Sequence, residues 1–101
     1  MKKKFYLYIL ASKRNGTLYT GITSNIQKRM EEHKKHFFKG SFSARYNVTK
    51  LVYLDVFDSF DYAVLAEKRI KKWYREQKLD LIEQHNPSWG DISEKPGFEI
   101  V

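Results

Sequence analysis

The sequence predicts an α+β fold, a small three-stranded antiparallel sheet flanked by helices in the order ββαβα(α). Three observations support this prediction. Residues 5–11 are apolar on both alternating faces, which is typical of a central strand covered on both sides. Asn15-Gly16 then indicates a tight hairpin turn. Later segments repeat apolar residues at the helical period. The 101 residues are expected to form one domain, spanning 1–101, with one modest core.

Three segments have the apolar pattern of strands: residues 5–11, 17–22 and 48–57. The first two flank Asn15-Gly16, so we expect them to pair antiparallel as a hairpin. Residues 38–47, which contain a glycine and two serines, are expected to form a loop before the third strand.

Three further segments are expected to be helical: one from Thr23 or Ser24 to about residue 36 or 37, one over 60–78 and one over 79–85. Thr23 or Ser24 can cap the first helix, and Ser59 can cap the second. Asn86 is expected to end the third, because a residue before proline avoids helical geometry.

The composition favours a polyanionic partner. Nineteen Lys and Arg against twelve Asp and Glu give a net charge of +7. Such a charge favours nucleic acid over an anionic membrane surface, and the alternative is a basic domain with an ordinary solvated surface. The chain has no cysteine, which excludes a disulfide framework and fits the cytoplasm. No apolar run approaches the ~20 residues that span a bilayer, so no membrane partner is expected.

Glu67 falls inside an apolar stripe of the helix expected over 60–78. At the helical period, the stripe contains Ala63, Ala66, Ile70 and Trp73. A carboxylate on a buried face is costly unless a cation meets it. A nearby Lys or Arg would make Glu67 a structural residue, whereas a metal ion would make it catalytic.

The hairpin and the first helix bring a second group of residues together. Tyr8 and Tyr19 lie on neighbouring strands of the expected hairpin, and Arg29 and His33, four residues apart, share one helical face. Each residue also has a plain structural interpretation, as a strand aromatic or a solvated helix charge. A zinc pair of His33 and His36 is disfavoured, because no third ligand is evident.

The ordered set of motifs resembles the GIY-YIG nuclease family. The matching elements are Tyr6-Leu7-Tyr8, Tyr19-Thr20-Gly21, residues 22–29 ending at Arg29, residues 66–73 containing Glu67, and residues 81–87 containing Asn86. The likeness covers nearly the whole chain and is closest to small single-domain members, similar to the nuclease domain at the start of the UvrC repair subunit. The first motif lacks the family's glycine and isoleucine, and Thr20 replaces the second isoleucine, but both motifs keep their tyrosines.

The resemblance implies a metal-dependent endonuclease that hydrolyses DNA phosphodiester bonds, with branched DNA in repair or recombination as the expected setting. The implied site consists of a ligand for Mg²⁺ or Mn²⁺, Glu67, and five catalytic residues, Tyr8, Tyr19, Arg29, His33 and Asn86. Tyr8 would activate the attacking water or relay its proton, Arg29 would grip the phosphate, and His33 would assist proton transfer. All six side chains are expected to line one concave surface.

A different class of function remains open. The sequence shows no extra DNA-binding domain of the kind many family members carry, so a protein partner that supplies targeting is expected. The alternative is therefore a nucleic-acid-binding or adaptor module on the same fold, inactive without its partner. A module that had lost nuclease activity would be expected to lack Glu67, Arg29 or a tyrosine, and all of these are present.

Overall fold

A computed structural model describes residues 3–35 and 46–98. These residues form strands β1 (Phe5–Ala11), β2 (Leu18–Thr23) and β3 (Lys50–Phe57), helices α1 (Ile26–Lys34), α3 (Phe60–Lys71) and α4 (Arg75–His85), and a 3₁₀ turn, η1 (Ile92–Glu94). The predicted α+β fold is confirmed, with a three-stranded antiparallel sheet in the order β2-β1-β3. Most of the loop expected over 38–47 lies outside the described residues.

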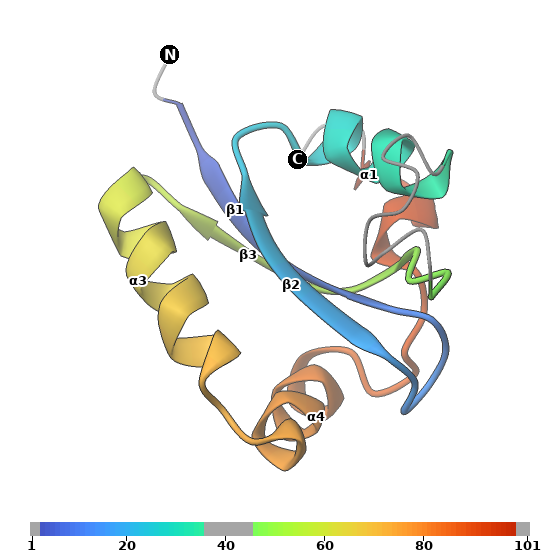
Figure 1. Cartoon of the computed structure of the whole chain (residues 1–101). Helices are drawn as coiled ribbons and strands as arrows, with labels where there is room; N and C mark the ends of the chain where they lie inside the picture. The colour runs from blue at the N-terminus through green and yellow to red at the C-terminus, as the bar shows by residue number, and fades with distance from the viewer. Residues whose placement is uncertain (1–2, 36–45, 99–101) are drawn as a thin grey trace.

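The central strand β1 is covered on both faces, as its sequence predicts. Its residues 6–11 are all buried. Helix α1 covers one face of the sheet, and α3 and α4 cover the other (Figure 1). The α1 side of the core is formed by Tyr6, Tyr8, Leu10, Ile26, Met30, Val48 and Leu51. The opposite side is formed by Leu7, Ile9, Ala11, Val52, Tyr53, Ile70, Ile82 and Trp89. Alternate residues of β1 therefore serve two separate halves of the core.

The predicted hairpin between β1 and β2 is confirmed. The N–H of Ser12 donates to the carbonyl of Thr17 at 3.0 Å, and the N–H of Gly16 donates to that of Lys13 at 2.9 Å. Asn15 takes the left-handed conformation with φ 57°, which asparagine tolerates better than most residues. The second strand begins at Leu18, one residue later than expected.

The prediction that Thr23 or Ser24 caps α1 is wrong. Asn25 is the N-cap, and its side-chain oxygen accepts a hydrogen bond from the N–H of Lys28 at 3.1 Å. Thr23 is still paired with Tyr6 in the sheet, and its hydroxyl oxygen accepts from the N–H of Asn25 at 3.1 Å. Strand β2 thus ends at Thr23, where a helix cap was expected, so α1 begins later in the chain than predicted. The expected end of this helix, at residue 36 or 37, lies outside the described residues.

The continuous helix expected over 60–78 is broken. The predicted cap Ser59 is confirmed, but α3 ends at Lys71 and α4 begins at Arg75. The N–H groups of Lys72 and Trp73 donate three residues back, at 3.2 and 3.1 Å, which tightens the last turn. Tyr74 is then extended, with ψ 155°. The break lets both helices pack on one face of the sheet.

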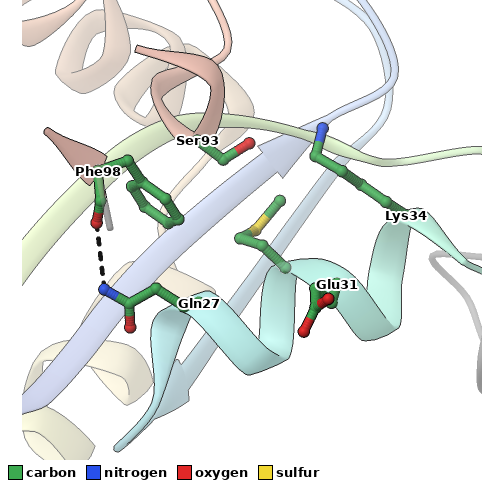
Figure 2. Close-up of a pocket in the computed structure, with 6 residues that line it drawn as sticks. Gln27, Glu31, Lys34, Ser93 and Phe98 are labelled. Carbon is green, nitrogen blue, oxygen red and sulfur yellow. Dashed lines mark hydrogen bonds between the residues drawn. The ribbon is translucent and has the colours of Figure 1, made fainter. Parts of the chain in front are cut away.

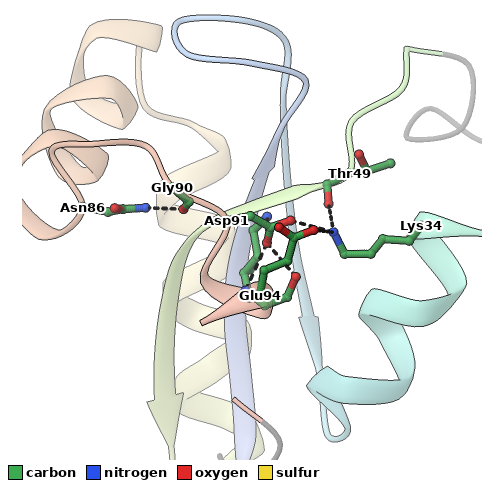
Figure 3. Close-up of polar contacts among 8 residues, drawn as sticks. Lys34, Thr49, Asn86, Gly90, Asp91 and Glu94 are labelled. Carbon is green, nitrogen blue, oxygen red and sulfur yellow. Dashed lines mark hydrogen bonds and ion pairs between the residues drawn. The ribbon is translucent and has the colours of Figure 1, made fainter. Parts of the chain in front are cut away.

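The segment after α4 fastens the helices to the sheet. Trp89 is 1% exposed, and its indole N–H donates to Glu83 at 2.6 Å. Asp91 accepts from the N–H of Leu51 in β3 at 3.2 Å and pairs with Lys34 of α1 at 2.6 Å (Figure 3). The side chain of Gln27 in α1 donates to the carbonyl of Phe98 at 3.1 Å (Figure 2). Both ends of α1 are therefore tied to the C-terminal segment.

Within residues 3–35 and 46–98, no helix is both long enough and apolar enough to cross a bilayer.

Candidate active site

The site begins where Tyr8 of β1 faces Gly21 of β2. The two residues are paired in the sheet register, and the Tyr8 side chain lies across the space above Gly21. A Cβ on residue 21 would lie 2.6 Å from the Tyr8 hydroxyl oxygen and 3.2 Å from a ring carbon of Tyr19. Any side chain there would force the ring of Tyr8 away, so glycine fixes the position of the phenol.

Two further rings meet the Tyr8 phenol. Tyr19, two residues before Gly21, has its ring centroid 6.3 Å from that of Tyr8. His33 of α1 lies 5.9 Å from the ring of Tyr8 and 5.6 Å from that of Tyr19. The Nε2 atom of His33 is 3.3 Å from the Tyr8 hydroxyl, and His33 is 6% exposed. The predicted approach of the two tyrosines and His33 is thus present in the structure.

Arg29 reaches the same hydroxyl from one turn earlier in α1. Its Nη1 donates to the Tyr8 oxygen at 3.5 Å, and its Nε pairs with Glu32 at 3.2 Å. Glu32 is a site residue that the sequence analysis missed, although its position three residues after Arg29 is a signal for such a pair. A polar hollow of about 340 Å³ beside Arg29 is lined by Thr23, Ser24, Asn25, Lys28, Arg29 and Glu32.

The environment sets the protonation states of Tyr8 and His33. Burial and the neighbouring Tyr19, with a smaller contribution from Glu67, raise the pKa of the Tyr8 phenol to about 12, against the opposing effect of Arg29. Burial and the charge of Arg29 lower the pKa of His33, against the opposing effect of Glu32. At neutral pH the phenol therefore keeps its proton and the imidazole is neutral, so Tyr8 can donate to Nε2 of His33.

Glu67 approaches the site from α3, on the other face of the sheet. Helix α3 packs against β2, and the charge of Glu67 is close enough to raise the pKa of Tyr8. Its side chain is 18% exposed and pairs at 3.4 Å with Lys71, whose side chain is 53% exposed. Glu67 is therefore less buried than its place in the apolar stripe suggested. Its described cationic partner is a surface lysine, which would regain water if the pair were broken.

Comparisons with known proteins identify the family of this chain. Residues 4–80 match the model of the GIY-YIG catalytic domain. The chain belongs to the GIY-YIG family. It is 40% identical over 82 residues to a UPF0213 protein of Syntrophus aciditrophicus (strain SB), a match that covers 81% of this chain and 93% of the relative. It is 41% identical over 85 residues to a UPF0213 protein of Streptococcus pyogenes serotype M5, covering 82% and 89% of the two chains.

A solved structure shows the same fold. The solution NMR structure of a UPF0213 protein from Bacillus halodurans matches with a TM-score of 0.54 and 23% identity, and the match covers 92% of this chain and 97% of that one. Membership of the GIY-YIG family implies an endonuclease-type function and DNA binding for this domain.

The described side-chain contacts of Asn86 join it to β3 and to the C-terminal turn. It is 4% exposed, and its side-chain amide donates to the carbonyls of Val52 at 3.0 Å and Gly90 at 2.9 Å (Figure 3). Its backbone N–H donates to Ile82 and ends α4. These contacts do not test whether Asn86 shares one concave surface with the other five residues, so that part of the expectation stays a prediction. Its amide is already occupied by backbone groups of β3 and the C-terminal turn.

A separate hollow of about 330 Å³ lies between α1 and the C-terminal segment, lined by Gln27, Met30, Glu31, Lys34, Ser93 and Phe98 (Figure 2). Neither tyrosine of the site, nor Arg29, nor Glu67 lines it, so the GIY-YIG site is elsewhere. In the described part of the chain, no three His, Asp or Glu side chains gather as metal ligands. His36, the second histidine of the disfavoured zinc pair, lies outside the described residues.

Proposed function

We propose that this GIY-YIG domain is a Mg²⁺-dependent endonuclease that cleaves DNA at the site formed by Tyr8, Arg29, His33 and Glu67. The observation that carries the proposal is the contact of His33 and Arg29 with the Tyr8 phenol. Tyr8 contacts the neutral imidazole of His33 at 3.3 Å and the guanidinium of Arg29 at 3.5 Å, with the Glu67 carboxylate close enough to act on its pKa. Such a group supplies a proton acceptor, a phosphate ligand and a metal ligand together.

The donor set fits Mg²⁺ or Mn²⁺ better than zinc. Glu67 offers one partly exposed carboxylate, and no cluster of three His, Asp or Glu ligands occurs in the described residues. Mg²⁺ commonly binds one or two carboxylates and fills its remaining positions with water and substrate phosphate. When bound, the ion would neutralise phosphate charge and stabilise the leaving oxygen.

Within this proposal, each residue has a role that its contacts support. Arg29 binds the scissile phosphate through its planar guanidinium, oriented by Glu32. A phenol with a pKa of about 12 is not a ready phenolate, so Tyr8 acts as a relay. It accepts the proton of the attacking water as it passes its own to Nε2 of His33. The ring of Tyr19 packs beside both groups and limits how they move.

The proposed substrate is branched DNA in repair or recombination, in the cytoplasm, with a protein partner supplying targeting. The net charge of +7 supports a polyanionic substrate. The second candidate function is a DNA-binding or adaptor module without activity of its own, which the same charge would also serve.

A panel of labelled DNAs tests the proposal. The purified chain is incubated with single-stranded, blunt duplex, flapped and four-way junction DNA, in Mg²⁺ or in EDTA. We expect cleavage of at least one branched substrate in Mg²⁺ and none in EDTA. Binding of all four DNAs without cleavage in Mg²⁺ or Mn²⁺ would instead support the adaptor module.

The pH dependence of cleavage should reveal the state of His33. The imidazole must be neutral to accept a proton, and burial together with Arg29 lowers its pKa below the ordinary 6.5. The acid decline of the single-turnover rate should therefore be centred below pH 6.5. The His33→Gln variant should cleave more slowly, and its rate should not show this decline at low pH. A decline centred above pH 6.5, or an unchanged decline in His33→Gln, would contradict the relay.

A further inference from the structure

We propose that Tyr74, with the cations around it, forms a stacking platform for an unpaired base of a nucleic acid strand. The platform lies at the junction of α3 and α4, outside the group of residues that meets at Tyr8. This inference rests on the proposed function. It adds that part of the substrate is a strand whose bases are exposed on at least one face.

The ring of Tyr74 serves neither the core nor the start of α4. The residue is 82% exposed, more than any other large hydrophobic residue in the described part of the chain. It occupies the N-cap position of α4, where Ser, Thr, Asn or Asp are favoured. Its own backbone N–H donates to the side chain of Gln77 at 2.9 Å, an interaction that needs no phenol. Local stability therefore gives no reason for a large exposed ring at this position.

The surroundings of Tyr74 are strongly cationic. Residues 67–78 contain six cations, Lys68, Arg69, Lys71, Lys72, Arg75 and Lys78, against two acids, Glu67 and Glu76. Arg75 is held in place, because its Nη2 donates to the carbonyls of Asn15 and Gly16 at 2.7 and 2.6 Å. Arg75 also lines a hollow of about 290 Å³, together with Thr17, Leu18 and Lys78. An aromatic ring within a cationic surface is the arrangement by which proteins bind single strands.

The platform continues directly from the proposed metal ligand. Lys71 pairs with Glu67 one helical turn away, and Tyr74 follows three residues later. Helix α3 ends at Lys71 and α4 begins at Arg75, so only the short junction at 72–74 separates the turn that holds Glu67 and Lys71 from α4. In this proposal, one strand places a phosphate at Glu67 and an unpaired base on Tyr74.

A blunt duplex would not use this platform, because its bases are stacked on one another and their faces are covered. Strand ends, flaps and single strands expose such faces, and stacking tolerates any base. The platform thus favours DNA with a single-stranded portion over fully paired DNA, whereas the cations can contact the phosphates of both kinds.

Binding measured in EDTA tests this inference separately from cleavage. Fluorescence anisotropy is recorded for a single-stranded oligonucleotide and its blunt duplex at two salt concentrations. Tyr74→Ala is expected to bind the single strand about 5- to 150-fold more weakly, the range for loss of one base–aromatic stack. Tyr74→Phe should bind as the wild type does. Duplex affinity and the salt dependence should change little, because no phosphate contact is removed.

Tyr62→Ala is the matched control. Tyr62 is 68% exposed on α3, but its neighbours in the sequence are the acidic residues Asp58 and Asp61, which repel a phosphate backbone. This variant should therefore bind as the wild type does. If the wild type binds single strands and Tyr74→Ala binds them equally well, the platform is wrong and the proposed nuclease function stands. If the wild type binds no DNA even at low salt, the DNA-cleaving function fails as well. The exposed ring would then suit a protein partner.

Discussion

Glu67→Ala is expected to abolish DNA cleavage in Mg²⁺ while leaving the fold and most DNA affinity intact. The variant removes the proposed metal ligand, whereas phosphate contacts come from Arg and Lys side chains. Its cost in stability should be small, because the described partner Lys71 is half exposed and an i,i+4 surface pair contributes about 0.3–0.5 kcal/mol. For a domain of this size, that corresponds to a melting temperature within about 2–4 °C of the wild type.

Cleavage assays in Mg²⁺ and thermal melts in EDTA measure both halves of this prediction. Glu76→Ala is the matched control, because Glu76 is an exposed glutamate in the first turn of α4 and should affect neither quantity. If Glu67 served instead to neutralise a buried cation, its loss would lower the free energy of unfolding by about 3–5 kcal/mol. A variant that is destabilised in this way but still cleaves per folded molecule would contradict the metal assignment.

Asn86→Ala is expected to show the opposite pattern, with lower stability and retained chemistry. The substitution leaves the carbonyls of Val52 and Gly90 without the amide that now donates to them at 3.0 and 2.9 Å. Leaving such buried groups unpaired costs about 1–3 kcal/mol. Each kcal/mol lowers the melting temperature by about 4–8 °C in a domain of this size. Cleavage per folded molecule should remain, since none of the described contacts joins Asn86 to the tyrosines.

Ser88→Ala is the control for this position. Its hydroxyl donates to Asn86 at 3.4 Å, a long contact at an exposed residue, so its loss should leave both stability and activity nearly unchanged. An Asn86→Ala variant that melts like the wild type and fails to cleave would restore the catalytic role implied by the family resemblance.

The pairing of Tyr8 with Tyr19, and of Arg29 with His33, could be predicted because each pair depends on local geometry, whereas the approach of one pair to the other was implied by the family resemblance. A two-strand hairpin fixes which residues face each other across it. An interval of four residues fixes a shared face of a helix. Both rules act over short stretches of chain, and the structure brings together the four residues they select.

The parts that sequence reasoning missed depend on contacts between distant segments. No Gly or Pro marks the break between α3 and α4, where the N–H groups of Lys72 and Trp73 donate three residues back. The burial of Asn86 depends on β3, more than thirty positions earlier in the chain. The motif singled out this residue but carried no information about which atoms its amide would contact. Likewise, only the packing of α3 shows how far Glu67 is exposed.

Paramagnetic broadening by Mn²⁺ tests the central claim most directly, because it locates the metal without depending on turnover. Mn²⁺ replaces Mg²⁺ in a two-dimensional NMR spectrum of the labelled 101-residue chain. We expect Mn²⁺ to broaden the backbone signals of Tyr8, Gly21 and Glu67 first in the wild type. In Glu67→Ala, the signals of Tyr8 and Gly21 should stay sharp. Broadening centred instead on Asp91 and Glu94, the carboxylates that flank Lys34 (Figure 3), or equal broadening in both proteins, would contradict the claim.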